Sequence, residues 1–283
     1  MNAPEVVSFL ISELRDRNSD EARLCLTTVP NANSMVELAF ARTIELFPDL
    51  DTVLVARTAC SVLSKAWKNE PELQGFVECL LKRISDLTLQ QISRVLFAAA
   101  TSRSLDSEMR NRIYVESRRT VINSLNRYNE APPRVVSKLA VGLATLGEGM
   151  ADVELWKSIS KHATDCASTM EPEHVQQVSF ALSRVSSQNT DLTNALTRRA
   201  VLVSPIANAK TYVSLLVSLS RLPRDMACGD WRSFCRIFRD QFGIPVRGHI
   251  SLGKLRECLE AVKFFPTDHQ LRLARNALRD SVS

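Results

Sequence analysis

Apolar residues recur along this chain with the period of an α-helix, and the same pattern returns in six segments. Within each segment, apolar residues stand at a first position and four residues later, and in all segments but one also seven residues later, so they share one face of a helix. The residue just before the central position is small in most segments. The central positions lie 36 to 44 residues apart and are Leu63, Ala99, Leu143, Leu182, Leu219 and Leu259.

A repeat near 40 residues with this spacing is typical of stacked helical hairpins. A single hairpin cannot bury its apolar face alone, so neighbouring hairpins stack and share one extended core. The pattern therefore predicts an all-α fold, an α-solenoid of antiparallel helical hairpins with a repeat of about 36–44 residues. We expect one domain over residues 1–283, in which 1–50 form N-terminal capping helices, 51–265 form the core repeats and 266–283 form a C-terminal capping helix.

Helix start and stop signals divide the chain into helices with short connections. No segment alternates polar and apolar positions as a half-buried strand does. Capping residues satisfy the free N–H groups at a helix start, and the candidates are Asp51, Asp106, Asn189 and the pairs Ser34 with Glu37, Thr88 with Gln91 and Thr267 with Gln270. The expected helices are 4–17, 20–28, 34–47, 51–68, 71–85, 88–102, 106–126, 132–146, 151–168, 172–187, 190–203, 207–222, 230–242, 251–264 and 267–281.

Composition narrows the possible environment of the protein. The chain has 283 residues, of which 45% are hydrophobic, and no apolar run approaches the length of about 18 residues that a membrane span requires. The first 17 residues carry Glu5, Glu13 and Asp16, which is unlike a secretory signal or a transit peptide. We therefore expect either a cytoplasmic protein or one from which a targeting segment has been removed.

The seven cysteines are scattered and form no CxxC pair. Most fall on apolar stripes, as Cys60, Cys79 and Cys258 do, and we expect buried, reduced thiols in a reducing compartment. His162 and Cys166 stand four residues apart on one helix and could share a metal, but two ligands are too few for a zinc site. A surface histidine beside a core cysteine is the simpler interpretation.

No arrangement of residues indicates catalysis. Gly147, Glu148 and Gly149 lack the lysine and the following Ser or Thr of a phosphate-binding loop and are better explained as a helix stop. We therefore expect a protein that is not an enzyme and that needs no cofactor and no metal.

Charge is distributed unevenly along the chain. The formal net charge is +5, but residues 1–70 carry a net charge of −3 and residues 211–283 a net charge of +5. Such ends favour either head-to-tail contact or two different partners. Arg outnumbers Lys by 27 to 9, and the planar guanidinium suits both phosphates and protein interfaces.

Two columns of the repeat carry an excess of cations. They stand five residues before and two residues after the central positions, so they share one helix face, and six of their twelve residues are basic while none is acidic. Stacked hairpins would line these residues up along one surface, which suits the phosphates and bases of single-stranded RNA. The alternative is an ordinary solvated face that also includes Thr58, Thr101, Thr145 and Ala261. We define the basic ladder as the candidate RNA-binding residues Lys65, Arg94, Lys138, Gln177, Arg184, Ser214, Arg221 and Lys254.

A second patch lies between residues 231 and 242. Its aromatic residues form one helical stripe, which most often means core. An adjacent stripe is a candidate protein-docking face, because Arg and exposed aromatic residues dominate interfaces. Its basic members are Arg232, Arg236 and Arg239.

The segments "VVSKLAVGLATLG", "HVQQVSFALSRV" and "YVSLLVSLSRL" resemble the degenerate repeats of heptatricopeptide, octotricopeptide and FAST-kinase-like proteins. Those families are similar to pentatricopeptide repeat proteins, and they act on mitochondrial or plastid RNA. The resemblance implies a non-catalytic RNA-binding or scaffold subunit of a mitochondrial RNA-processing, RNA-editing or mitoribosome-assembly complex. Its partners would be single-stranded RNA and other protein subunits, with no membrane and no DNA.

The repeat length varies here, so the base-reading code of pentatricopeptide repeats does not transfer. The alternative is a pure protein–protein adaptor of the HEAT or armadillo type.

Overall fold

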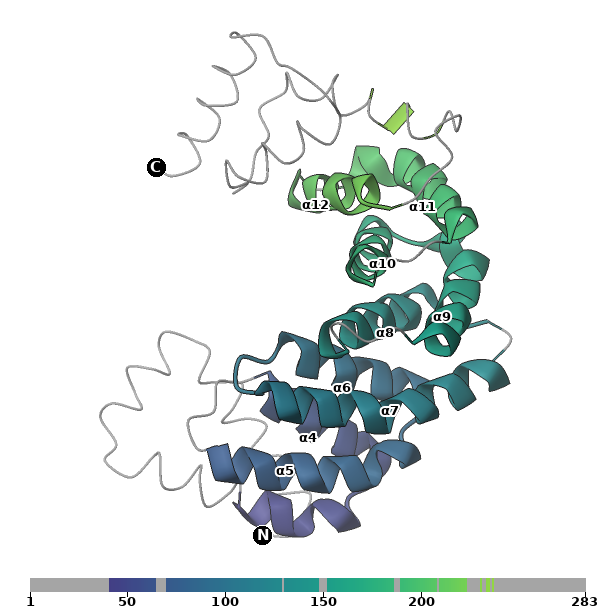
Figure 1. Ribbon diagram of the computed structural model, residues 1–283. Helices are drawn as coiled ribbons and strands as arrows, with labels where there is room; N and C mark the ends of the chain where they lie inside the picture. The colour runs from purple at the N-terminus through teal and green to yellow at the C-terminus, as the bar shows by residue number, and fades with distance from the viewer. Residues whose placement is uncertain are drawn as a thin grey trace, which may run out of the picture. The chain divides into compact units, whose positions relative to one another are not determined.

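The computed structural model describes residues 41–64, 70–128, 130–147, 152–185, 189–207, 209–222, 230, 233–234 and 236. Every regular element in these ranges is a helix, which confirms the all-α prediction at that level. The α-helices are α4 (Thr52–Leu63), α5 (Glu70–Arg83), α6 (Leu89–Thr101), α7 (Ser107–Arg127), α8 (Pro133–Leu146), α9 (Val153–Cys166), α10 (Pro172–Arg184), α11 (Thr190–Val203) and α12 (Ala209–Ser220), as labelled in Figure 1.

Residues 41–46 are also helical. The helices expected at 4–17, 20–28, 251–264 and 267–281 lie outside the described residues, as does most of the helix expected at 230–242. None of the described helices is long and apolar enough to cross a membrane.

The described helices gather into two compact units. The first contains residues up to Tyr128 together with 145–147, and the second contains residues 129–144 and those from Glu148 onwards. In the first unit α4 packs against α6, α5 packs against α7, and α6 packs against α7. In the second unit α10 packs against α12, α9 packs against α11, and α10 packs against α11. Within each unit, therefore, a helix contacts both its neighbour in sequence and the helix after that.

The repeat pattern of the sequence identifies the core of both units. The central residues Leu63, Ala99, Leu143, Leu182 and Leu219 are at most 1% exposed. The residues four positions earlier, Ala59, Val95, Leu139, Val178 and Leu215, are fully buried. Leu139, Leu143, Val178, Leu182, Leu215 and Leu219 thus lie where the apolar period predicts them.

The predicted caps also form. The carboxylate of Asp51 accepts hydrogen bonds from the N–H groups of Val53 and Leu54, at 2.8 and 2.9 Å. Thr88 and Gln91 make a complete capping box at the start of α6, and Asp106 and Asn189 cap α7 and α11. These bonds satisfy N–H groups that a helix start leaves without a partner. The candidate caps at Ser34 and Thr267 lie outside the described residues.

A 3₁₀ turn follows several helices, and none of these turns was expected as a separate element. These turns are η1 (Phe47–Asp49), η2 (Ile84–Asp86), η3 (Ala167–Thr169) and η4 (Ser204–Ile206). Each begins with a buried residue and is closed by a hydrogen bond from the N–H group of the residue after the turn to the carbonyl of its first residue. An extended residue follows each turn and redirects the chain.

At two of these turns, an arginine side chain from another helix donates hydrogen bonds to backbone carbonyls. At the end of α5, Arg83 donates hydrogen bonds to the carbonyls of Phe47 and Leu50, at 3.2 and 3.0 Å. On α11, Arg199 donates to the carbonyl of Met170, at 2.7 Å. Part of the arginine excess of this chain therefore holds the helical hairpins together.

Gly147 lies at the C-terminal end of α8, where the sequence predicts a helix stop. A Cβ atom at this position would collide with the ring of Tyr114, which is itself buried. Only glycine leaves room for so close an approach.

Several side chains differ from the expectation. Thr58 is fully buried on α4, although its column was expected to face solvent. The Cys60 and Cys79 side chains are half-buried rather than fully buried. His162 is buried while Cys166 is only half-buried, the reverse of the predicted surface histidine and core cysteine. In each case the neighbouring helices, and not the period of the helix itself, decide which face is covered.

Candidate nucleic-acid interface

The even-numbered helices share a common set of register positions. Five residues before, two before and two after the central leucine lie on one helix face, because three and seven residues separate them. On α10 these positions are Gln177, Phe180 and Arg184. On α12 they are Ser214, Val217 and Arg221.

In the second unit, two of the predicted cations stand on helices in direct contact. Arg184 ends α10, Arg221 follows α12, both side chains are exposed, and α10 packs against α12. Gln177 and Ser214, one repeat column earlier, are half-buried. Lys138 on α8 is half-buried as well. The two arginines hold the same register on adjacent helices.

In the first unit, α6 carries Arg94 and Thr101 at the same two register positions, and both are exposed. Thr58, at the corresponding position of α4, is 0% exposed, so the polar column does not extend to that helix. Lys65 and Lys254 lie outside the described residues, and so does Ala261.

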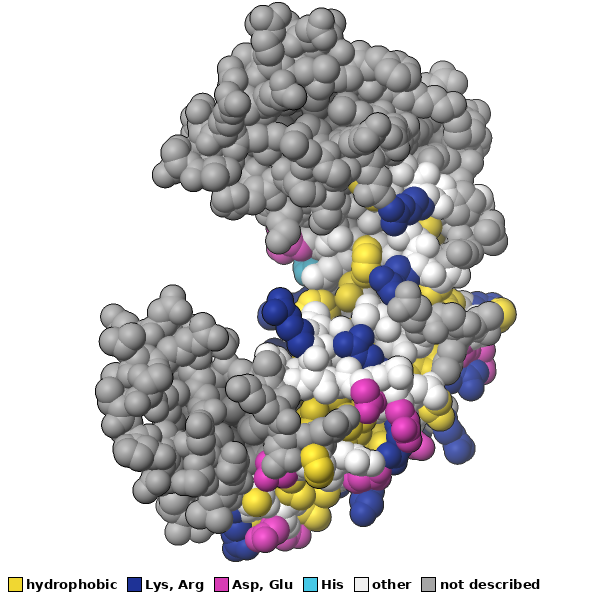
Figure 2. All heavy atoms as spheres, turned by 60° about the vertical axis from the view of Figure 1, so that its left-hand side comes forward, with side chains coloured by type: hydrophobic (Ala, Val, Ile, Leu, Met, Phe, Trp, Pro, Cys, Tyr) yellow, Lys and Arg dark blue, Asp and Glu magenta, His cyan; other side chains and the backbone are white. Residues whose placement is uncertain are grey.

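Figure 2 shows Lys and Arg side chains dispersed over the visible face of the described helices, some beside Asp and Glu side chains and others among uncharged atoms. Such spacing differs from a dense basic patch, in which cations adjoin one another. Discrete cations suit successive phosphates along a strand, since each phosphate carries one charge.

The ring of Phe180 lies on the same face of α10 as Gln177 and Arg184, and it was not among the predicted site residues. The guanidinium carbon of Arg184 lies 5.6 Å from the ring centroid of Phe180, within the range of a cation–π interaction. Phe180 is half-buried, and so is Phe97 at the same position of α6. Both rings stand two residues before a central position of the repeat. This position lies on the same helix face as the two basic columns, and that spacing is the sequence signal that points to the rings.

The candidate docking arginines are only partly described. Arg236 is exposed, while Arg232 and Arg239 lie outside the described residues. Phe234, from the aromatic stripe, is fully buried. Its carbonyl accepts a hydrogen bond from the Tyr212 hydroxyl at 3.2 Å, and the two rings lie 5.1 Å apart. For this residue the core interpretation of the stripe is correct.

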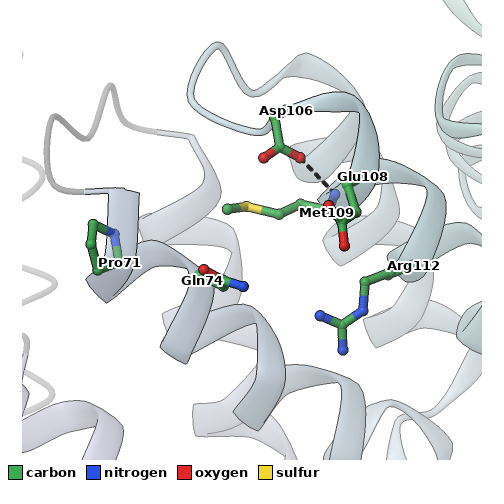
Figure 3. A pocket seen from close by; sticks show the side chains of 6 residues that line it. All are labelled: Pro71, Gln74, Asp106, Glu108, Met109 and Arg112. Atoms are coloured by element: carbon green, nitrogen blue, oxygen red, sulfur yellow. Dashed lines mark hydrogen bonds between the residues drawn. The ribbon is translucent and has the colours of Figure 1, made fainter.

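A pocket of about 240 Å³ lies between α5 and α7 in the first unit. Figure 3 shows its lining residues, with Asp106 bonded to the backbone of Met109. Arg112 makes a paired contact with Glu78, in which Nη2 lies 2.8 Å from Oε2. This hydrogen bond lowers the pKa of the Glu78 carboxyl. The charged groups here therefore cap a helix and link two helices. The residues lining the pocket are Pro71, Gln74, Asp106, Glu108, Met109 and Arg112.

His162 and Cys166 do not make a metal centre with other described residues. Burial raises the pKa of the Cys166 thiol to about 11, so the thiol is protonated near neutral pH. Within the ranges that the structure describes, no group of three or more His, Cys, Asp or Glu side chains gathers in metal-binding geometry.

Of the basic ladder, the structure brings Gln177, Arg184, Ser214 and Arg221 together on two packed helices. Arg94 lies in the other unit, and Lys138 lies on α8. No protein-family model matches this chain, and no curated protein matches it in sequence.

Proposed function

We propose that this protein is a non-catalytic RNA-binding scaffold, in which the helical hairpins continue as one α-solenoid and the basic ladder contacts single-stranded RNA. The proposal includes a role as a subunit of a mitochondrial RNA-processing, RNA-editing or mitoribosome-assembly complex. That part is supported by the resemblance of the repeat segments to organellar RNA-binding repeats and not by geometry.

One observation carries the RNA-binding part of the proposal. Arg184 and Arg221 are exposed at the same register of two helices that pack against each other. Packed helices lie about 8–10 Å apart, so the two guanidinium groups are spaced to meet different phosphates of one extended strand. Gln177 and Ser214 add hydrogen-bonding groups on the same helices, and such groups suit base edges.

A protein–protein adaptor is the second candidate, and a different observation favours it. Leu202 and Ile206, near the end of α11, are 65% and 75% exposed. Val153, at the start of α9, is 79% exposed. Exposed aliphatic side chains on the odd-numbered helices suit contacts with other subunits. This surface is compatible with RNA binding on the even-numbered helices.

Binding of single-stranded RNA over a range of salt concentrations tests the proposal. Replacing Arg184 and Arg221 together by Ala should weaken binding for all sequences alike. It should also flatten the slope of log K against log salt by about 1.4 to 2, because each phosphate contact contributes roughly 0.7 to 1 to the slope.

A matched control removes two exposed arginines elsewhere. Arg119 and Arg127 are exposed on α7, and replacing both by Ala changes the net charge equally. The control should keep its affinity within about twofold of the parent, since neither arginine belongs to the basic ladder and exposed charges are screened beyond about 10 Å at 0.1 M salt. Equal losses of RNA affinity in both double variants, or no RNA binding by the parent at low salt, would favour the protein–protein adaptor as the function.

A further inference from the structure

The contact between Phe180 and Arg184 joins an aromatic ring to a planar cation on the surface of α10. The two residues are four apart, so they are neighbours along the helix face. The ring is half-buried and the arginine is exposed. The guanidinium group therefore forms the outer layer of the pair and the ring forms the inner layer.

A supported guanidinium group differs from an ordinary surface arginine. The ring holds it at 5.6 Å from the centroid, which restricts a side chain that otherwise samples many rotamers. Guanidinium planes stack on nucleobases in single-stranded RNA. A pre-oriented plane loses less freedom when a base stacks on it.

We propose that Arg184, held by Phe180, is a stacking platform for one nucleobase of a bound RNA strand. This inference rests on the proposed function and adds a contact to a base to the contacts with phosphates. Gln177 lies on the same face, one and two turns from the pair. Its amide can donate to and accept from a base edge, so this part of α10 offers both a stacking plane and an edge contact.

Helix α12 lacks the same arrangement. Arg221 stands four residues after Val217, just as Arg184 stands four residues after Phe180, but an aliphatic side chain has no π-face. We therefore expect Arg221 to act on the strand through its charge alone. Of these two arginines, only Arg184 is therefore expected to stack on a base.

The decisive variant is Arg184→Lys, which keeps the positive charge and removes the planar group. The full chain is titrated with a short oligo-uridine and with an abasic ribose-phosphate oligomer of the same length and charge. Stacking on a base contributes about 1–3 kcal/mol, so Arg184→Lys should bind oligo-uridine about 5- to 150-fold more weakly. Its affinity for the abasic oligomer and its salt slope should equal those of the parent protein.

Two further variants separate stacking from folding. Phe180→Leu removes the ring and should reproduce the loss on oligo-uridine, whereas Phe180→Trp should retain binding. Arg119→Lys, at an exposed arginine of α7 outside the basic ladder, is the matched control and should bind both oligomers like the parent. Circular dichroism and thermal unfolding identify any variant that no longer folds, and ultraviolet cross-linking of the parent protein to oligo-uridine should then give an adduct within residues 177–184.

The outcomes distinguish the two proposals. If the parent binds oligo-uridine and Arg184→Lys binds it equally well, the stacking platform is wrong while RNA binding stands. An equal loss on both oligomers would also overturn it, because the lysine variant would then have lost a backbone contact. If the parent binds neither oligomer at low salt, RNA binding itself fails, and a defect of Arg184→Lys in assembly with a purified protein partner would assign the pair to a protein interface.

Discussion

Single leucines at the central repeat positions carry much of the packing in the described helices. Leu182 is 1% exposed on α10 and Leu219 is fully buried on α12, and these two helices pack against each other. Burying a leucine side chain contributes about 1.5–3 kcal/mol. The apolar period predicts such residues well, because the geometry of one helix decides which positions share a face.

Leu182→Ala should lower the free energy of unfolding by about 2–5 kcal/mol, since it removes buried atoms and leaves a cavity. Equilibrium denaturation in urea, followed by circular dichroism, measures the change. Leu202→Ala is the control: Leu202 is 65% exposed on α11, and its replacement should change stability by no more than about 0.5 kcal/mol. Similar values for the two variants would contradict the assigned core.

The burial of polar side chains is harder to predict from the sequence than that of the leucines. Thr58 occupies a register position at which α6 carries the exposed Arg94, yet Thr58 is fully buried. His162 is buried too. A helical period alone cannot tell a polar residue that faces solvent from one that a neighbouring helix covers, because both satisfy the same spacing.

At the scale of elements, the ends of the helices depend on short-range chemistry and on contacts between hairpins. The side chains of Asp51, Thr88, Asp106 and Asn189 cap helices as their types predict. The first two residues of η2 and of η3 were expected to continue the preceding helices, because such residues suit either conformation. In contrast, η4 falls in an expected connection between helices. Long-range hydrogen bonds from arginines then hold some turns in place, and no local signal in the sequence predicts them.

Arg83→Met tests whether the hydrogen bonds of Arg83 stabilise the turn η1. The change keeps an apolar stem and removes the hydrogen bonds to the carbonyls of Phe47 and Leu50, so we expect a loss of about 1.5–3 kcal/mol in the free energy of unfolding. Denaturation in urea again provides the measurement. Arg42→Met is the control, because Arg42 pairs with Glu45 at a site where both side chains are more than half exposed, and such pairs contribute at most about 1 kcal/mol. Equal effects would mean that the turn is held in another way.

At the scale of the whole molecule, the described residues form two units with the same pattern of helix packing. In each, α-helices contact the helix two positions later as well as their neighbour. The proposed solenoid extends this pattern through the whole chain. The two end segments of the chain differ in net charge, because residues 1–70 are acidic overall and residues 211–283 are basic.

A continuous solenoid is more extended than a globule of equal length. A compact chain of 283 residues has a radius of gyration of about 19 Å. Small-angle X-ray scattering should give a larger value, with an asymmetric pair-distance distribution, and light scattering should establish the mass of the scattering species. A monomer with a radius near 19 Å and a symmetric distribution would rule out the solenoid.

The sequence by itself determined the helical class, most helix positions, the caps and the buried leucine columns, because each depends on spacing and chemistry within about one or two turns of a helix. It also identified the two arginines that stand in register at the C-terminal ends of α10 and α12. Only the tertiary structure decided that Thr58 and His162 are covered, that Arg83 and Arg199 bind turns of other segments, and that Arg184 lies over Phe180. Burial and long-range contacts depend on which helix packs against a given face, and side-chain rotamers such as that of Arg184 depend on the packed surface around them.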